Sequence, residues 1–340
     1  MMEKMLSGCR LANAEALPGF SGGFVGYFSY ENVEYFEDIR LEKHKGPKIP
    51  DGIFFLCRDL VIFDHYRKTL VIVSLVETSP RGRLQARYRE AEKKMAGLAA
   101  RLRRPLVVPA KSAKKTTPPF EPNMTPAAFQ KKVRRIKEYI RAGDCIQVVL
   151  SQRFRTHAPS EDFQIYRALR SINPSPYMFY FRSGKVRLIG SSPEMLVKKT
   201  GRTAEVRPIA GTRPRGKSPA EDLALEESLK KSSKELAEHL MLVDLGRNDL
   251  GRVCQFRTIR VEDYARVERY SHVMHLVSDV VGKLKPGKNA FDLLKAAFPA
   301  GTVTGAPKIR AMQIISELEA ENRGPYAGCL GYFSFNQDMD

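Results

Sequence analysis

The sequence FPAGTVTGAPKIRAMQIISELE, residues 298–319, indicates a glycine-rich loop that leads directly into a helix. Gly301 and Gly305 permit backbone conformations that other residues avoid, and Pro307 suits the first turn of a helix. Such a loop points backbone N–H groups at a docked anion, to which Lys308 would add positive charge. An ordinary capped helix start has the same pattern, so the rest of the chain decides between the two interpretations. Apolar residues follow at helical spacing: Ile309, Met312, Ile315 and Leu318.

Length and composition indicate a soluble globular protein of one large domain or two domains. The chain has 340 residues, of which 43% are hydrophobic and 28% are charged. No apolar run reaches the ~20 residues that span a bilayer, and the start MMEKMLSGCR lacks the apolar core of a signal peptide. We therefore expect a cytoplasmic protein that does not enter a membrane. Five scattered cysteines favour reduced, mostly buried thiols over disulfides or a zinc site.

The positive charge is concentrated in one part of the chain. Residues 81–155 contain 20 Lys and Arg against 5 Asp and Glu, which gives +15 of the formal net charge of +19. Within this part, residues 81–104 have the pattern of a solvated amphipathic helix. A basic nucleic-acid-binding module is the alternative of another class, but no aromatic ladder or nucleic-acid motif accompanies the charge. The apolar residues expected on the inner side of this helix are Leu84, Tyr88, Met95, Leu98 and Leu102.

A Pro- and Lys-rich connector at 105–126 divides the chain. We expect a β-rich segment that ends in the basic helix at 1–104 and a second region, which carries the motifs below, at 127–340. Strands arrive in groups with helices between the groups, which favours an α+β fold with antiparallel sheets over a parallel sheet. The strands of the first segment are expected at 22–30, 53–65 and 69–77.

Capping patterns predict helix starts in the second region. Thr125 followed by Pro126 opens one helix, and the sequence SPAE at 218–221 opens another with Pro219 at its first position. A further helix runs through KELAEHLMLVDL, and a strand is expected at 147–154.

Several titratable side chains have spacings that fit either chemistry or a solvated surface. Glu235 and Glu238 would share one helix face, as ligands of a hard cation such as Mg²⁺ or as a solvated edge. Glu194 follows a strand that ends in small residues, where burial can raise the pKa of a carboxyl enough to make it a proton donor; a surface glutamate is the alternative. His272 and His275 lack the third ligand of a zinc site, which favours one general acid or base and one structural imidazole.

Nine ordered motifs from about Phe20 onward resemble the chorismate-utilising enzymes, and within that family most closely the anthranilate synthase component I group. Each motif alone is weak, but nine in order are very improbable by chance. The resemblance implies two large antiparallel sheets packed as a sandwich with helices on the outside. The motifs are GGFVGYFSY, GDCIQVVLSQRF, NPSPYMFYF, GSSPEMLV, RPIAGTRPRG, KELAEHLMLVDLGRNDLGRV, SHVMHLVSDVVG, FPAGTVTGAPKIRAMQIISELE and RGPYAGCLGYFSF.

The resemblance also implies a reaction. Ammonia from a glutamine amidotransferase partner adds to the ring of chorismate, the ring hydroxyl leaves, and elimination of pyruvate gives anthranilate for tryptophan biosynthesis. Hydroxide is a poor leaving group, so a proton donor and a cation are required near the substrate. The family pattern implies that Glu194 protonates the hydroxyl and that His275 assists proton transfer near the ring. It also implies that Glu238 binds Mg²⁺, with Glu235 close to the ion.

Other positions match substrate contacts of the family. The resemblance places Thr302 among the catalytic residues. It also implies that the Gly305 loop lies beside a substrate carboxylate, near which Lys308 supplies positive charge. The tight loop PIAGTRPRG presents two more positions. The remaining substrate contacts implied by the resemblance are Gly211, Thr212 and Tyr326.

Two positions distinguish members of the family. Relatives that add water carry a lysine base where this chain has Gln147, and a neutral amide cannot deprotonate water. Aminodeoxychorismate synthases often carry a lysine nucleophile where this chain has Ala210, so direct attack by ammonia is the simpler mechanism. Anthranilate synthase is therefore the expected activity, and aminodeoxychorismate synthase of the folate pathway is the alternative.

The chain departs from the family pattern in several places. Pro176, Tyr177 and Met178 match a turn that binds tryptophan as an inhibitor, but the companion L-L-E-S segment is absent, and Ser232 replaces a usual aspartate. The family continues past Asp340 with a carboxylate-binding arginine, a glycine-rich turn and a second magnesium glutamate. We therefore expect a chain shortened at both ends with an incomplete site, and whether this chain is active alone stays open.

Overall fold

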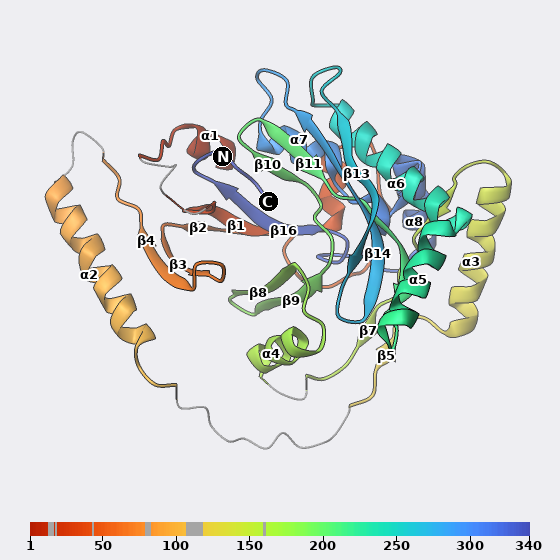
Figure 1. The fold of residues 1–340 in the computed structure, drawn as a ribbon, viewed down its shortest axis with the longest axis horizontal. Helices are drawn as coiled ribbons and strands as arrows, with labels where there is room; N and C mark the ends of the chain where they lie inside the picture. Colours follow the sequence, from red (N-terminus) through yellow and green to blue (C-terminus); the bar gives the residue numbers. More distant parts are fainter. Residues whose placement is uncertain (13–16, 18, 43, 79–82, 107–117, 159–160) are drawn as a thin grey trace. The chain divides into compact units, whose positions relative to one another are not determined.

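The computed structural model describes residues 1–12, 17, 19–42, 44–78, 83–106, 118–158 and 161–340, in which short strands and helices succeed one another (Figure 1). The helices are α1 (Met2–Ser7), α2 (Leu84–Leu102), α3 (Pro126–Arg141), α4 (Asp162–Ile172), α5 (Pro219–Lys231), α6 (Ser233–Gly251), α7 (Ala290–Ala297) and α8 (Lys308–Leu318), with 3-10 helices η2 (Tyr30–Tyr35) and η3 (Gly301–Val303). The strands are β1 (Gly23–Phe28), β2 (Gly52–Cys57), β3 (Asp59–Asp64), β4 (Thr69–Ser74), β5 (Glu121–Pro122), β6 (Gln147–Val148), β7 (Phe154–Arg155), β8 (Tyr177–Ser183), β9 (Val186–Ser192), β10 (Lys198–Thr200), β11 (Thr203–Val206), β12 (Ile209–Pro214), β13 (Arg260–Arg269), β14 (Val273–Lys283), β15 (Gly305–Ala306) and β16 (Cys329–Ser334).

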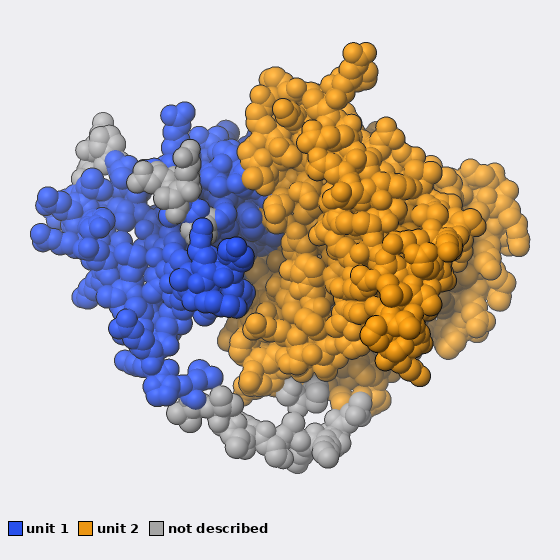
Figure 2. All heavy atoms as spheres, viewed as in Figure 1, with its two compact units in different colours: residues 1–26, 54–112, 331–339 blue, residues 27–53, 113–330, 340 orange. Residues whose placement is uncertain are grey.

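The chain forms two compact units, coloured separately in Figure 2. This grouping differs from the linear division expected at 105–126, because the chain passes between the units several times; residues 107–117 of the connector lie outside the described part. Strands β16, β1 and β2 form a three-stranded sheet in that order. Unit 1 contains residues 1–26, 54–112 and 331–339, and unit 2 contains residues 27–53, 113–330 and 340.

In unit 1, an antiparallel hairpin of β3 and β4 carries the basic helix. The hairpin pairs Asp59 with Ser74 at one end, and α2 packs against β4. The prediction for the inner side of α2 is wrong for Leu84, Tyr88 and Leu102. The buried residue of this helix is Ala91 instead. The helix contacts one strand through a narrow stripe, which leaves Leu84, Tyr88 and Leu102 exposed by 49%, 57% and 45%.

Unit 2 is built around a five-stranded sheet with the order β10–β11–β14–β12 and with β13 paired to β14. Residues of β14 pair with β13 on one edge and with β11 and β12 on the other, so β14 is the central strand. Its apolar residues are accordingly buried, and α5 and α6 pack against the sheet (Figure 1). The β14 side chains without exposed surface include those of Met274, Leu276, Val277 and Val280.

The expected α+β class with antiparallel sheets is confirmed, although the described strands are distributed over six sheets, most of them two-stranded. Both predicted helix caps are present. The Thr125 hydroxyl accepts from the Ala128 amide at 3.2 Å, and the Ser218 hydroxyl accepts from the Glu221 amide at 3.3 Å. The strand expected at 147–154 is wrong over most of its length, because β6 finds a partner only in the two residues of β15.

The five cysteines are free thiols, as expected. Cys145 and Cys254 are buried, whereas Cys9 is exposed. Within the described ranges, no helix is both long enough and apolar enough to cross a membrane.

Candidate active site

Glu194 is held by the glycine-rich loop at 298–307. It follows β9 after one intervening residue, and its two carboxylate oxygens each lie 2.8 Å from Oγ1 of Thr302 in η3. Burial of the carboxyl group raises the pKa of Glu194 to about 7, and the hydrogen bond from Thr302 opposes that rise. At neutral pH the group can therefore both hold and release a proton.

A cavity of about 40 Å³, open to solvent, adjoins Glu194 and Thr302. Besides these two residues, its polar lining consists of Arg207 and Asp249, while the other side chains from α6 are apolar. Burial raises the pKa of Asp249 to about 6, against the lowering effect of Lys308. The cavity thus combines two carboxyl groups of raised pKa with a mostly apolar wall. At neutral pH, Glu194 keeps its proton in a large fraction of molecules, whereas Asp249 is mostly ionised beside Lys308.

The tight loop expected for PIAGTRPRG is wrong, because Ile209–Pro214 form the strand β12, which pairs with β14 beside His275. The register between β12 and β14 shifts at Gly211, whose φ of +68° is the left-handed conformation that glycine adopts readily. This bulge brings Thr212 opposite His275, with Oγ1 3.1 Å from Nδ1, and Nδ1 also lies 3.2 Å from the Gly211 carbonyl oxygen. These partners engage Nδ1, which leaves Nε2 as the ring nitrogen that can meet another group.

Glu235 and Glu238 share one face of α6 in its first two turns. Arg213 donates to Glu235 at 3.2 Å, and the Gln147 amide donates to Glu238 at 3.5 Å. The Gln147 side-chain oxygen is buried and has no hydrogen-bond partner. Across the described part of the chain, no group of three or more His, Cys, Asp or Glu side chains is placed to hold a metal ion, so this pair has no third protein ligand of these types.

Lys308 does not stand free to bind an anion. Its side chain is 8% exposed, and Nζ donates to Asp249 at 2.8 Å and to the Ala297 carbonyl at 2.9 Å. The expectation that Lys308 adds charge for a docked anion is therefore not supported by its contacts, because Asp249 neutralises it. Pro307 is the N-cap of α8 rather than its first helical residue.

The other expected contacts are spread along unit 2. Tyr326 is 55% exposed, with the Arg323 guanidinium over its ring. Tyr177 and Met178 begin β8, directly after the exposed Pro176, and none of the three lines the cavity around Glu194.

A family model described as chorismate binding enzyme matches residues 4–340. The chain therefore belongs to the chorismate binding enzyme family. It is 48% identical over 328 residues to anthranilate synthase component 1 of Streptomyces coelicolor and 48% identical over 329 residues to that of Aquifex aeolicus. The matches cover 95% and 96% of this chain but 64% and 66% of the relatives, so the chain spans just under two thirds of their length.

Two solved structures have a similar fold. The crystal structure of anthranilate synthase component I from Streptococcus pneumoniae superimposes with a TM-score of 0.88 at 37% identity, covering 100% of this chain and 75% of that one. A menaquinone-specific isochorismate synthase from Escherichia coli has a TM-score of 0.69 at 21% identity, over 93% of this chain and 67% of that one, and shows the shared fold.

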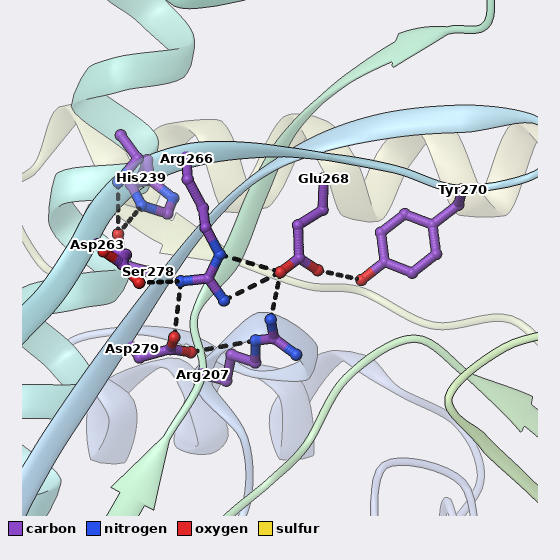
Figure 3. Close-up of polar contacts among 9 residues, drawn as sticks. Arg207, His239, Asp263, Arg266, Glu268, Tyr270, Ser278 and Asp279 are labelled. Atoms are coloured by element: carbon purple, nitrogen blue, oxygen red, sulfur yellow. Dashed lines mark hydrogen bonds and ion pairs between the residues drawn. The ribbon is translucent and has the colours of Figure 1, made fainter. Parts of the chain in front are cut away.

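Sequence reasoning missed a charged network beside the central strand β14. In Figure 3, Arg266 and Glu268 of β13 meet Arg207 and Asp279, and Tyr270 donates to Glu268 at 2.9 Å. Arg207 also lines the cavity near Glu194, so the network fixes one cavity wall. The alternation of Arg266, Glu268 and Tyr270 along one face of a strand was the available signal.

His239, next to Glu238 on α6, has no exposed surface and points at Ser278 of β14 (Figure 3). Its Nε2 lies 2.6 Å from the Ser278 hydroxyl, which also accepts from the Ala265 amide at 2.8 Å. Burial lowers the pKa of His239 to about 4. The imidazole is therefore neutral in the folded chain and anchors α6 to the central strand.

The neutral His239 should make the fold sensitive to acid. Its folded pKa is about 4, below the ordinary 6.5, so the stability it contributes is complete above pH 6.5 and is lost as the pH falls toward 4. Between pH 7.5 and 4.5, urea unfolding should show a loss about 2–3 kcal/mol larger in the wild type than in His239→Gln. The exposed His272 supplies the control, His272→Gln. Equal losses in the wild type and His239→Gln would contradict this prediction.

Proposed function

We propose that this chain carries the chorismate site of an anthranilate synthase and takes part in converting chorismate and ammonia to anthranilate and pyruvate. The observation that supports this most directly is Glu194, a buried carboxyl whose pKa is raised to about 7 and which is bonded by Thr302. The similarity to relatives named anthranilate synthase component 1 supports the product. The nucleic-acid alternative is not favoured, because family membership covers the basic region as well.

Glu194 would act as the general acid. Hydroxide leaves the chorismate ring poorly, so the departing oxygen requires a proton at the moment the bond breaks. A carboxyl with a pKa of about 7 is protonated in a large fraction of molecules at neutral pH. Once the proton has gone, the Thr302 hydroxyl stabilises the resulting carboxylate by donating to it.

Ammonia is the proposed nucleophile, supplied by a glutamine amidotransferase partner. Gln147 stands beside Glu238 as a neutral amide, and Ala210 offers no side-chain amine. Because Gln147 is not a lysine, no base at that position activates water. Because Ala210 is not a lysine, no nucleophile at that position forms a covalent bond to the ring. His275, held through Nδ1 by Gly211 and Thr212 of β12, would move the remaining proton, and Tyr326 would contact the substrate.

Glu238 and Glu235 are the residues that would hold Mg²⁺. This ion is usually bound by one or two protein carboxylates together with substrate and water oxygens. The Gln147 amide, which bonds Glu238 through its nitrogen, has an oxygen without a hydrogen-bond partner. When bound, Mg²⁺ would supply positive charge for a substrate carboxylate. Pro176, Tyr177 and Met178 match one part of a tryptophan-binding turn, but this chain lacks the companion L-L-E-S segment, so inhibition by tryptophan is not part of the proposal.

Chorismate binding should depend on Mg²⁺ and on Glu238. In calorimetry with the 340-residue chain, we expect binding in the presence of Mg²⁺ and at least a ten-fold weaker affinity in Glu238→Ala. Glu227→Gln is the matched control, because Glu227 lies exposed on the neighbouring α5, where it pairs with Lys231. Equal affinity with and without Mg²⁺ would contradict the assignment of the carboxylate pair.

Product analysis separates the two amination reactions. With chorismate, ammonium and Mg²⁺, anthranilate synthase activity releases one pyruvate per anthranilate. An aminated ring that retains its enolpyruvyl group would instead identify aminodeoxychorismate synthase, the alternative for which Ala210 lacks the lysine.

A further inference from the structure

Arg323, in the segment between α8 and β16, is a buried cation that donates four hydrogen bonds. Its side chain is 2% exposed, and that of its partner Glu319 is 6% exposed. Nε and Nη2 donate to the two Glu319 oxygens at 2.9 and 2.7 Å. Two further bonds of 2.7 Å run from Nη1 to the Val303 carbonyl and from Nη2 to the Val149 carbonyl.

These bonds join two segments that carry site residues. Val303 follows Thr302, which bonds Glu194, and Val149 lies two positions after Gln147, which bonds Glu238. The segments also bond each other directly, because the Val149 amide donates to the Thr304 carbonyl at 2.8 Å. Glu319 completes the attachment by accepting from the Ser151 amide at 2.8 Å.

Arg323 also supports the exposed Tyr326. Its guanidinium carbon lies 5.6 Å from the centre of the Tyr326 ring and 4.8 Å from that of the buried Tyr30. Both distances are within the range of cation–π attraction. One arginine therefore contacts three groups that neighbour or form proposed substrate and catalytic positions.

We propose that Arg323 is a positioning residue of the active site, which sets Thr302 against Glu194 and Gln147 against Glu238. Its planar fork reaches four acceptors on three segments at once. A lysine ammonium at this position has one nitrogen and cannot reach them together. The mechanistic consequence rests on the proposed role of Glu194 as general acid, whereas the positioning itself does not.

The pKa of Glu194, measured by carbon-13 NMR of labelled glutamate carboxyls and assigned with Glu194→Gln, tests the inference without turnover. Thr302→Val removes the hydrogen bond that lowers this pKa, so we expect a rise of about one unit. Arg323→Lys should loosen the same bond and raise the pKa by about half a unit. In the double variant, the pKa should rise no further than in Thr302→Val.

Arg153→Lys is the matched control, because Arg153 pairs with Glu321 at 2.7 Å in a neighbouring, partly exposed position. It should leave the pKa of Glu194 unchanged. An unchanged pKa in Arg323→Lys, or shifts that simply add in the double variant, would overturn the inference. With chorismate and ammonium, Arg323→Lys should lower kcat about tenfold with little change in KM. No turnover in the wild type would contradict the proposed function alone.

Native-state hydrogen exchange on the unsubstituted chain keeps the inference testable if Arg323→Lys does not fold. The Val149 and Ser151 amides should have similar protection, because the Arg323–Glu319 pair holds both in one unit. Exchange at Ser151 more than about tenfold faster than at Val149 would overturn it.

Discussion

Glu194→Gln should lower kcat with chorismate and ammonium about 10²–10⁴-fold, because the amide cannot donate the proton that the departing hydroxyl requires. Glutamine has the same size and can still accept a hydrogen bond from the Thr302 hydroxyl, so chorismate affinity should change little. Initial rates of anthranilate fluorescence across a chorismate series separate kcat from KM. A comparable rate in Glu194→Gln would exclude this residue as the acid.

The same substitution should stabilise the fold at high pH. The folded pKa of Glu194 is about 7, above the ordinary 4.5, so the stability it contributes is complete below pH 4.5 and is lost as the pH rises through 7. The loss by pH 8 amounts to about 3 kcal/mol, and Glu194→Gln should escape it.

Urea unfolding at pH 5 and 8 measures this difference and requires no activity. Glu138→Gln, on the exposed face of α3, serves as control. If Glu194→Gln loses as much stability between these pH values as the wild type, the carboxyl is not buried as described.

Local signals in the sequence were sufficient for the helix starts and for part of the site. The caps at Thr125 and Ser218 involve residues only three apart, so their geometry does not depend on the rest of the fold. Glu194 was recognisable as a potential acid from its place after a strand of small residues. The partner that holds it, Thr302, lies 108 residues away and could be connected to it only through the family resemblance.

Long-range pairing explains what the sequence could not predict. Lys308 appeared to be available for an anion, but Asp249, 59 residues earlier, neutralises it in the interior. Residues 147–154 have the pattern of one strand, but only Gln147 and Val148 find partners, in Gly305 and Ala306. In both cases the decisive partner is set by tertiary packing.

Gly305→Ala should destabilise the fold by at least about 3 kcal/mol, the sum of backbone strain and steric overlap. Gly305 has a φ of +141°, which residues with a side chain rarely adopt. A Cβ at this position would lie 2.0 Å from the Gln147 carbonyl oxygen and 2.9 Å from the Ala311 Cβ. The first neighbour is backbone of the paired strand, so it cannot rotate away.

Relief of that overlap requires β15 and β6 to separate, which distinguishes Gly305 from a glycine that has a positive φ but open space around it. Gly201→Ala is the matched control, because Gly201 has a φ of +58° and a Cβ added there would meet no atom within 4 Å. Urea unfolding should show a cost of about 1 kcal/mol for the control. Separation of the strands would also move Gln147 away from Glu238, so Gly305→Ala should weaken Mg²⁺-dependent chorismate binding while Gly201→Ala should not. Equal unfolding midpoints for the two variants would mean that the close approach of Gly305 to Gln147 does not constrain the site.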